Sequence, residues 1–223
     1  MPPVPPTYAQ PDIDFARVRA VVFDLGNVLL DLDNSIYGNG WPDDIGKDYT
    51  DFAQWLVGER LWYRYETGDI DTLDFLYRLH RRLGLSPKHI QTYWNGILRP
   101  GIASRRYDTL HRLSRKLPLH VLSNTNAIHI AWVRDHVTEA GHPDFETEFF
   151  THVTYSYHAG AVKPEPGIYE HLEAHVEQQP SGLLFIDDKV ENVEAAVARG
   201  WQAIWLKPGR PVEEVLQPLL AED

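Results

Sequence analysis

The chain has 223 residues, 43% of them hydrophobic and 24% charged, which is typical of a folded globular protein and excludes a wholly disordered or fibrous chain. Its formal net charge of -11 repels phosphate backbones and anionic lipids, so we expect neither nucleic acid nor a membrane as a partner. The absence of cysteine excludes disulfide frameworks, thiolate catalysis and cysteine-ligated metal centres.

The N-terminal segment, residues 1–14, is rich in proline and lacks the basic and apolar pattern of a signal peptide. We expect it to form a flexible arm. No apolar run approaches the ~20 residues that a membrane-spanning helix needs, so a cytoplasmic location is predicted. The sequence contains no signal of the oligomeric state.

Five short apolar runs, rich in β-branched and aromatic residues and bounded by polar or turn residues, predict β-strands. They span residues 18–23, 117–122, 152–155, 183–186 and 203–206. Helical patterns lie between them, one beginning near Pro166 and one ending before Gly200. Apolar strands that alternate with helices predict an α/β fold, a Rossmann-like parallel sheet with helices on both faces.

Residues 35–98 have helical periodicity and no convincing strand, which predicts a small helical cap inserted after the first strand. Ser86 and Pro87 indicate a helix start. Another helix is predicted before Gly84 from residues that recur every three or four positions: Ile70, Leu73, Leu76, His80 and Leu83. The α/β core would then comprise residues 15–34 and 99–223. The insert is rich in aromatic rings, most of which we expect to pack the cap, with one or two facing a ligand.

Polar side chains follow several of the predicted strands. They are Asp24, Ser123, Asn124, Asp187 and Asp188, with Lys163 on the loop after the strand at 152–155. Because ligands bind outside the carboxyl ends of strands in open α/β sheets, we expect these groups to meet in one crevice.

Three neighbouring carboxylates repel one another, and a hard divalent cation such as Mg²⁺ is the usual remedy. Mg²⁺ commonly binds one or two carboxylates together with substrate phosphate oxygens, so the cluster also predicts an anionic substrate. Ser123 and Asn124 can donate hydrogen bonds to phosphate oxygens, and Lys163 adds a charge-assisted contact.

The residues of these segments and their spacing resemble the haloacid dehalogenase-like hydrolase superfamily, whose four motifs all occur here in order. They correspond to Phe23-Asp24-Leu25-Gly26-Asn27-Val28, Leu122-Ser123-Asn124, Lys163-Pro164, and Phe185-Ile186-Asp187-Asp188 with Asn192. The residue pattern of these motifs is most similar to the bacterial branch that includes α-D-glucose-1-phosphate phosphatase and the phosphatase domain fused to epoxide hydrolases. One segment that supports this similarity is Tyr65-Glu66-Thr67-Gly68-Asp69-Ile70.

The resemblance implies a Mg²⁺-dependent phosphatase that acts on a small phosphorylated metabolite. Asp24 would attack phosphorus and form an aspartyl-phosphate, while Ser123 and Lys163 would bind the transferring phosphoryl group. The resemblance assigns the metal to Asp24, the Gly26 carbonyl, Asp187 and Asp188, with Asp188 as a direct ligand and Asn192 in support. Asn27 and Asn124 are expected to contact the substrate.

One position departs from the superfamily pattern. Most of its phosphatases have a second aspartate two residues after the nucleophile as general acid, and this chain has Gly26 there. A positioned general acid contributes about 10²–10⁴ in rate, so its absence is felt most with strongly basic leaving oxygens. We therefore expect a preference for more acidic leaving oxygens, such as that of a sugar 1-phosphate. Asp31 or Asp33, in the linker to the cap, could take the place of the missing general acid.

Two other functions remain open from the sequence. A 2-haloacid dehalogenase uses the same nucleophilic aspartate without a metal, although it has no use for the pair Asp187-Asp188. The second open function is a phosphate-binding module that lost catalytic turnover together with the general acid. His171 and His175 have the i,i+4 spacing of zinc ligands, but no His-Glu-x-x-His pattern accompanies them, so we interpret them as surface histidines.

Overall fold

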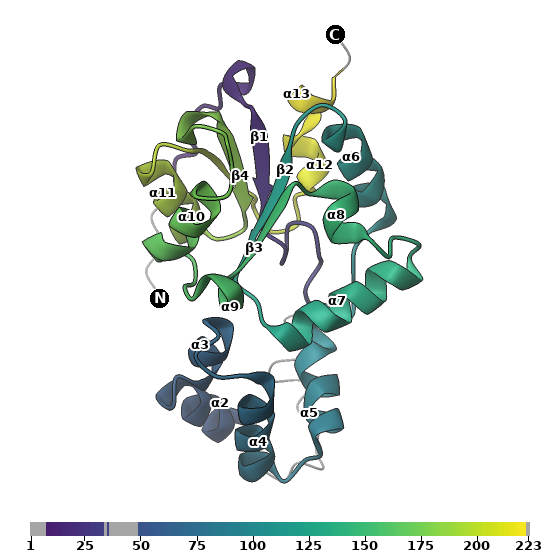
Figure 1. The fold of residues 1–223 in the computed structure, drawn as a ribbon, viewed down its shortest axis with the longest axis vertical. Coiled ribbons are helices and arrows are strands. Elements are labelled where there is room, and N and C mark those ends of the chain that lie inside the picture. Colours follow the sequence, from purple (N-terminus) through teal and green to yellow (C-terminus); the bar gives the residue numbers. More distant parts are fainter. Residues whose placement is uncertain (1–7, 34, 36–48, 222–223) are drawn as a thin grey trace, which may run out of the picture.

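The computed structural model describes residues 8–33, 35 and 49–221. A parallel five-stranded sheet forms its centre, in the order β3-β2-β1-β4-β5 (Figure 1). The strands are β1 (Ala20–Phe23), β2 (Leu119–Ser123), β3 (His152–Tyr155), β4 (Leu183–Asp187) and β5 (Gln202–Trp205). The predicted α/β fold is confirmed, and every predicted strand lies within two residues of its expected bounds.

Helices cover both faces of the sheet, because successive side chains of each buried strand point to opposite sides. Val21 and Phe23 of β1 belong to one apolar cluster, and Ala20 and Val22 to the other. The first face is covered by α6 (Ser104–Ser114), α7 (Ala127–Glu139), α8 (Phe145–Phe149), α12 (Val212–Val215) and α13 (Gln217–Leu220). The second is covered by α10 (Pro166–Glu173) and α11 (Val190–Ala198). Short helices complete the core: η1 (Phe15–Arg17), α9 (Ser156–Ala159) and η4 (Pro180–Gly182).

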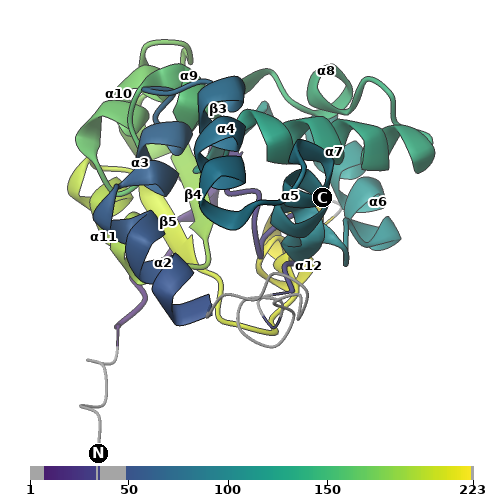
Figure 2. The ribbon, with the colours of Figure 1, turned by 90° about the horizontal axis from the view of Figure 1, so that it is seen from below.

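The cap is a set of helices inserted between β1 and β2, as predicted (Figures 1 and 2). Its elements are α2 (Tyr49–Gly58), α3 (Leu61–Glu66), α4 (Thr72–Leu83), α5 (Pro87–Trp94) and η3 (Asn95–Leu98). They have an apolar core of their own, to which Ile128 of α7 is added. The cap meets the sheet at its carboxyl end, where α3 contacts α9 and η3 contacts α7.

The helix predicted before Gly84 is α4. The helix begins at Thr72, after the N-cap Asp71, and ends at Gly84 in the left-handed conformation. Leu73 is 78% exposed and His80 is exposed, so only part of the predicted apolar spacing is buried. The residues that the helix buries are Phe75, Leu76, Leu79 and Leu83. Ile70, Leu76 and Leu83 of the predicted spacing are buried.

The described part of the N-terminal arm packs against β5. Gln10 Nε2 donates to the Ala203 carbonyl at 2.7 Å, and the Trp205 amide donates to Gln10 Oε1 at 2.8 Å. The Tyr8 ring meets the Trp205 ring edge-on, with the centroids 6.0 Å apart. Tyr8 and Gln10 thus contact β5, and the flexible arm over residues 1–14 stays a prediction. Residues 1–7 of that arm lie outside the described residues, as do 34 and 36–48 of the linker and cap.

Within the ranges 8–33 and 49–221, no helix is both long and apolar enough to cross a membrane.

Candidate active site

The predicted catalytic groups meet at the carboxyl ends of neighbouring strands. Asp24 directly follows β1, Ser123 ends β2, and Asp187 ends β4. Lys163 Nζ lies 2.7 Å from Asp24 Oδ1 and 2.7 Å from Asp187 Oδ2. Asp24, Lys163 and Asp187 are all buried, so one ammonium group joins two carboxylates largely out of contact with bulk water.

Asp187 is held by a network of hydrogen-bond donors. Asn192 Nδ2 donates to its Oδ1 at 2.9 Å and to its Oδ2 at 3.0 Å. The Lys189 amide donates to Oδ1 at 2.8 Å, and Lys163 donates to Oδ2. Asp187 is therefore fixed in orientation from both sides. The support predicted from Asn192 thus has a structural basis in its contact with Asp187, while its role toward a metal stays a prediction.

Asp188 is less enclosed than its neighbour. Its Oδ2 accepts one hydrogen bond, at 2.8 Å, from Asn27 Nδ2. Asn27 adopts the left-handed conformation, with φ of 57°, which turns the chain directly after Gly26 and brings the Asn27 amide to Asp188. The substrate contact predicted for Asn27 stays a prediction, because the contact that the structure shows is with Asp188.

Asn124 positions the loop that carries Lys163. Its Nδ2 donates to the Lys163 carbonyl at 2.9 Å, and the Lys163 amide donates to its Oδ1 at 2.7 Å. Both polar atoms of the Asn124 side chain are thus engaged by one backbone unit. The predicted contact between Asn124 and the substrate stays a prediction.

Ser123 is 3% exposed and lines the same cavity as Asp188. The N-cap of α7 is Asn126, whose side chain accepts a hydrogen bond from the His129 amide. Ser123 therefore does not cap that helix, which removes the ordinary structural explanation for a serine at this position.

The charges of the cluster favour a divalent cation. Ligand oxygens of Asp24, Asp187 and Asp188 all lie within 4.8 Å of one another. Burial raises the pKa of Asp24 above its ordinary value, Lys163 opposes this, and Asp187 adds to it. Burial also raises the pKa of Asp188. Lys163 compensates only one of the three negative charges, so the cluster fits the charge and the oxygen ligands of Mg²⁺.

Gly26 faces Leu32. A Cβ atom built on Gly26 would approach Leu32 Cδ1 to 2.9 Å, so an aspartate here requires the leucine to move. The two linker carboxylates are not placed to substitute for it. Asp31 pairs with Arg106 at 2.7 Å, and Asp33 accepts hydrogen bonds from Ser35. Neither lines the cavity in front of Ser123.

A cavity of about 540 Å³ lies between the cap and the sheet. Gly26, Ser123 and Asp188 line its inner end. The cap side consists mostly of apolar and aromatic side chains: Phe52, Ala53, Leu56, Trp62, Tyr93 and Trp94. The volume is in the range of small-molecule sites.

Glu66 is a cavity residue to which the sequence analysis gave no role. It ends α3, is 6% exposed, and its Oε2 atom has no hydrogen-bond partner among the described residues. Burial raises its pKa to about 7, although Trp62 donates a hydrogen bond to the carboxyl group. Gly68 could have signalled this arrangement, because a side chain there would collide with the Tyr157 carbonyl of α9. The glycine lets the end of α3, and with it Glu66, approach the core.

Residues 18–200 match the family model of haloacid dehalogenase-like hydrolases, and the chain belongs to this family. The match extends from β1 to the end of α11, so it includes every residue of the site described above.

Similar proteins include phosphatases. The chain is 25% identical over 192 residues to the sesquiterpene phosphatase astK of Aspergillus oryzae. This alignment covers 84% of this chain and 89% of that protein. It is 23% identical over 215 residues to D-ribitol-5-phosphate phosphatase of Bacteroides thetaiotaomicron, and this alignment covers 91% of this chain and 98% of that protein. A solved magnesium complex of a haloacid dehalogenase family enzyme from the same bacterium superposes with a TM-score of 0.77 and 25% identity. The match covers 90% of this chain and 98% of that one. Mg²⁺, the cofactor predicted for this chain, is thus the ion bound in that structure.

Proposed function

We propose that the chain is a Mg²⁺-dependent phosphatase of a small phosphorylated metabolite. The observation that carries this proposal is the buried, ion-paired cluster of Asp24, Lys163 and Asp187. It lies beside Asp188, whose carboxylate is within 4.8 Å of the other two and which lines the cavity under the cap. Phosphoryl transfer depends on positioning and charge neutralisation, and a buried ammonium among carboxylates supplies both.

The reaction has two steps. Asp24 attacks phosphorus, the bond between phosphorus and the ester oxygen breaks, and the alcohol leaves with a proton. Water then attacks the phosphorus of the aspartyl-phosphate, which returns the Asp24 carboxylate and releases inorganic phosphate. Lys163 and Ser123 hold the phosphoryl oxygens. Asp187 holds Lys163 in place and is itself fixed by Asn192.

Asp24, the Gly26 carbonyl and Asp188 are the proposed ligands of Mg²⁺. Asp187 remains a further candidate, but its oxygens already accept hydrogen bonds from Lys163, Asn192 and the Lys189 amide, which favours Asp188. Bound Mg²⁺ would supply neutralisation of the charge on the transferring phosphoryl group.

Hydrolysis of p-nitrophenyl phosphate with and without Mg²⁺ tests the class of enzyme. We expect release of p-nitrophenol that requires Mg²⁺ and disappears with EDTA. Chloride release from chloroacetate without metal would instead support the dehalogenase. No turnover of either compound, with phosphate still bound, would support the non-enzymatic module.

Glu66 is our candidate for the general acid that is absent at Gly26. Its carboxyl group is buried, has a free oxygen among the described residues and lines the same cavity as Ser123. A pKa of about 7 keeps the group partly protonated at neutral pH, which suits proton transfer to a leaving oxygen. The cap would thus supply the proton that the superfamily usually takes from the first motif.

Replacing Glu66 by Gln is expected to lower kcat/KM for alkyl phosphates by about 10²-fold, because their leaving oxygens need the proton. Hydrolysis of p-nitrophenyl phosphate, whose leaving group is weakly basic, should fall much less. Wild-type kcat/KM for alkyl phosphates should also decline as the pH rises above about 7, where the acid deprotonates, and the variant should lack this decline. Equal losses on both substrates would contradict the role.

The cavity favours a phosphate ester with an apolar body. Its cap wall is apolar and aromatic, and each buried methylene group of a substrate contributes about 0.8 kcal/mol. The similarity to a sesquiterpene phosphatase supports this class. A sugar 1-phosphate is the second candidate, supported by Gly26 in place of the usual acid and by the branch of the family that the motifs resemble.

Steady-state kinetics on prenyl monophosphates, glucose 1-phosphate and ribitol 5-phosphate separate these classes. We expect kcat/KM at least about tenfold higher for a prenyl phosphate, since two buried methylenes already suffice for that ratio. Replacing Leu56 by Gln should lower kcat/KM for the prenyl ester and leave p-nitrophenyl phosphate nearly unchanged. A sugar phosphate as the best substrate would overturn the apolar assignment but not the phosphatase.

A further inference from the structure

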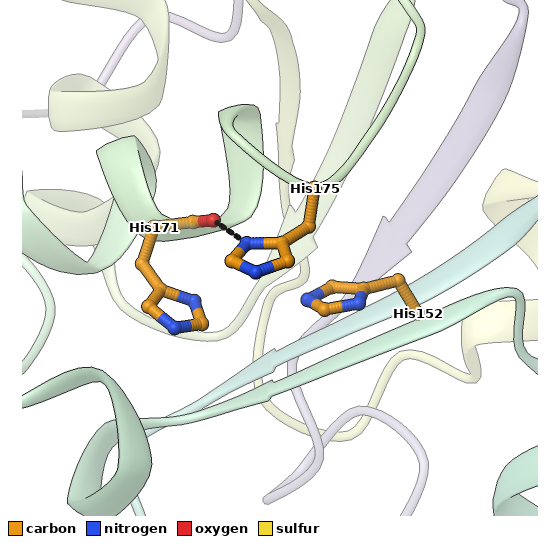
Figure 3. Close-up of side chains that lie close together, drawn as sticks. All are labelled: His152, His171 and His175. Atoms are coloured by element: carbon orange, nitrogen blue, oxygen red, sulfur yellow. Dashed lines mark hydrogen bonds between the residues drawn. The ribbon is translucent and has the colours of Figure 1, made fainter.

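His152, His171 and His175 form a cluster of three histidines (Figure 3). It lies at the end of the sheet opposite the proposed catalytic groups, as the strand positions show. His152 is the first residue of β3, whereas Ser123 is the last residue of β2. His171 lies in the last turn of α10, and His175 follows in the turn after it. One ring nitrogen of each histidine lies within 4.8 Å of those of the other two.

His171 and His175 each have a ring nitrogen without a hydrogen-bond partner among the described residues, whereas His152 Nε2 lies 3.1 Å from Thr154 Oγ1. His175 Nδ1 is 2.7 Å from the His171 carbonyl oxygen, so Nδ1 carries the proton and Nε2 is basic. Metal-binding histidines commonly donate their other N–H to a backbone carbonyl in this way. His171 Nδ1 is buried and has no hydrogen-bond partner within the part of the chain that the structure describes. A buried ring nitrogen without a partner is costly unless something binds it.

The three rings pack against one another, and this packing disfavours the charged forms of His152 and His171. His175 stacks between the other two rings, with centroids 4.8 Å from His152 and 4.6 Å from His171 (Figure 3). Burial lowers the pKa of His152 and of His171, and the neighbouring His175 lowers both further. No ion pair among the described residues joins these three rings to a carboxylate. Neutral imidazole is the form that binds metal ions.

Imidazole nitrogens select transition metals. Zn²⁺, Ni²⁺, Co²⁺ and Cu²⁺ bind them well, whereas Mg²⁺ prefers oxygen ligands. Two of the ligands come from a helix end and the following turn, and His175 is exposed, so small side-chain rotations can bring the nitrogens together around an ion. The sequence analysis missed the site because β3 contributes the third ligand from 19 residues before His171.

We propose that His152, His171 and His175 bind a zinc-class divalent ion at a site separate from the catalytic cluster. Water would complete the coordination, and the ion would tie the end of α10 to the start of β3. The same helix starts three residues after Lys163, so the ion would stabilise the scaffold behind the catalytic loop. This inference does not depend on the proposed function.

Zinc binding to the full-length protein in excess Mg²⁺, which occupies the carboxylate cluster, tests the site. Titration calorimetry with ZnCl₂ should give one equivalent for the wild type, weakened by at least about 10-fold in His175→Gln and in His152→Gln. Zn²⁺ should raise the thermal midpoint of the wild type by about 5–10 °C at a large excess over Kd, and not that of these variants. His89→Gln on the cap is the matched control and should behave as the wild type.

A second variant distinguishes this site from the cluster of His111, His142 and Glu148, which also brings ligand atoms within 4.8 Å. Loss of the zinc equivalent in His142→Gln with full retention in His175→Gln would overturn the proposal. Unchanged affinity in both His175→Gln and His152→Gln would also overturn it. The thermal midpoints in EDTA establish that each variant is folded.

Discussion

Replacing Asp24 by Asn lowers kcat for p-nitrophenyl phosphate by at least about 10³-fold, because an amide oxygen cannot act as the attacking nucleophile. The fold is expected to remain. Asn has the shape of Asp and still offers an oxygen to Lys163, which keeps its ion pair with Asp187. One fewer carboxylate also relieves repulsion within the cluster. Initial rates with saturating Mg²⁺ measure the loss, and thermal unfolding should show no decrease in the midpoint.

Mass spectrometry must accompany this variant, because deamidation of the introduced asparagine would restore the nucleophile. Residual activity that tracks the deamidated fraction agrees with the account. More than a tenth of wild-type kcat in protein free of deamidation would show that Asp24 is not the nucleophile.

Replacing Lys163 by Met has the largest expected effect on stability. Asp24 and Asp187 would both lose their ammonium partner while remaining buried, and breaking a buried ion pair in this way costs about 3–5 kcal/mol. Activity should be lost as well, because the phosphoryl group loses its cationic contact. Urea unfolding in EDTA measures the free energy of unfolding. Mg²⁺ should restore part of it, since the ion neutralises the same carboxylates.

Lys189→Met is the matched control for that experiment. Lys189 lines the same cavity, but its side chain is exposed and forms no ion pair within the structure's described part. Its loss should change the free energy of unfolding by less than about 1 kcal/mol. Equal destabilisation by the two variants would mean that the buried ion pairs do not hold this end of the sheet together.

The sheet and the cluster of polar groups at its carboxyl edge could be predicted because both depend on local patterns. Apolar strands that end in a polar residue indicate which groups meet at the sheet edge, and parallel order follows from the intervening helices. Asp24, Ser123, Asp187 and Asp188 lie where this reasoning places them. The roles assigned to the site residues and the division into domains, like the cytoplasmic location, stay predictions.

Contacts between distant segments could not be predicted. Glu66 enters the cavity because α3 packs against α9, which no spacing in the insert indicates. His152 meets His171 and His175 only once α10 has packed over the sheet. The exposure of Leu73 on α4 has a related reason: the residue is apolar, and only tertiary packing decides which apolar side chains a short helix buries.

Acid-quench mass spectrometry most directly tests whether Asp24 transfers the phosphoryl group at this site. The enzyme is mixed with p-nitrophenyl phosphate and Mg²⁺, quenched in acid and digested. The account predicts a peptide that contains Asp24 and carries the mass of one phosphoryl group, absent in EDTA and in Asp24→Asn. A phosphorylated peptide elsewhere in the chain, or rapid turnover with no phosphorylated peptide in the wild type, would contradict it.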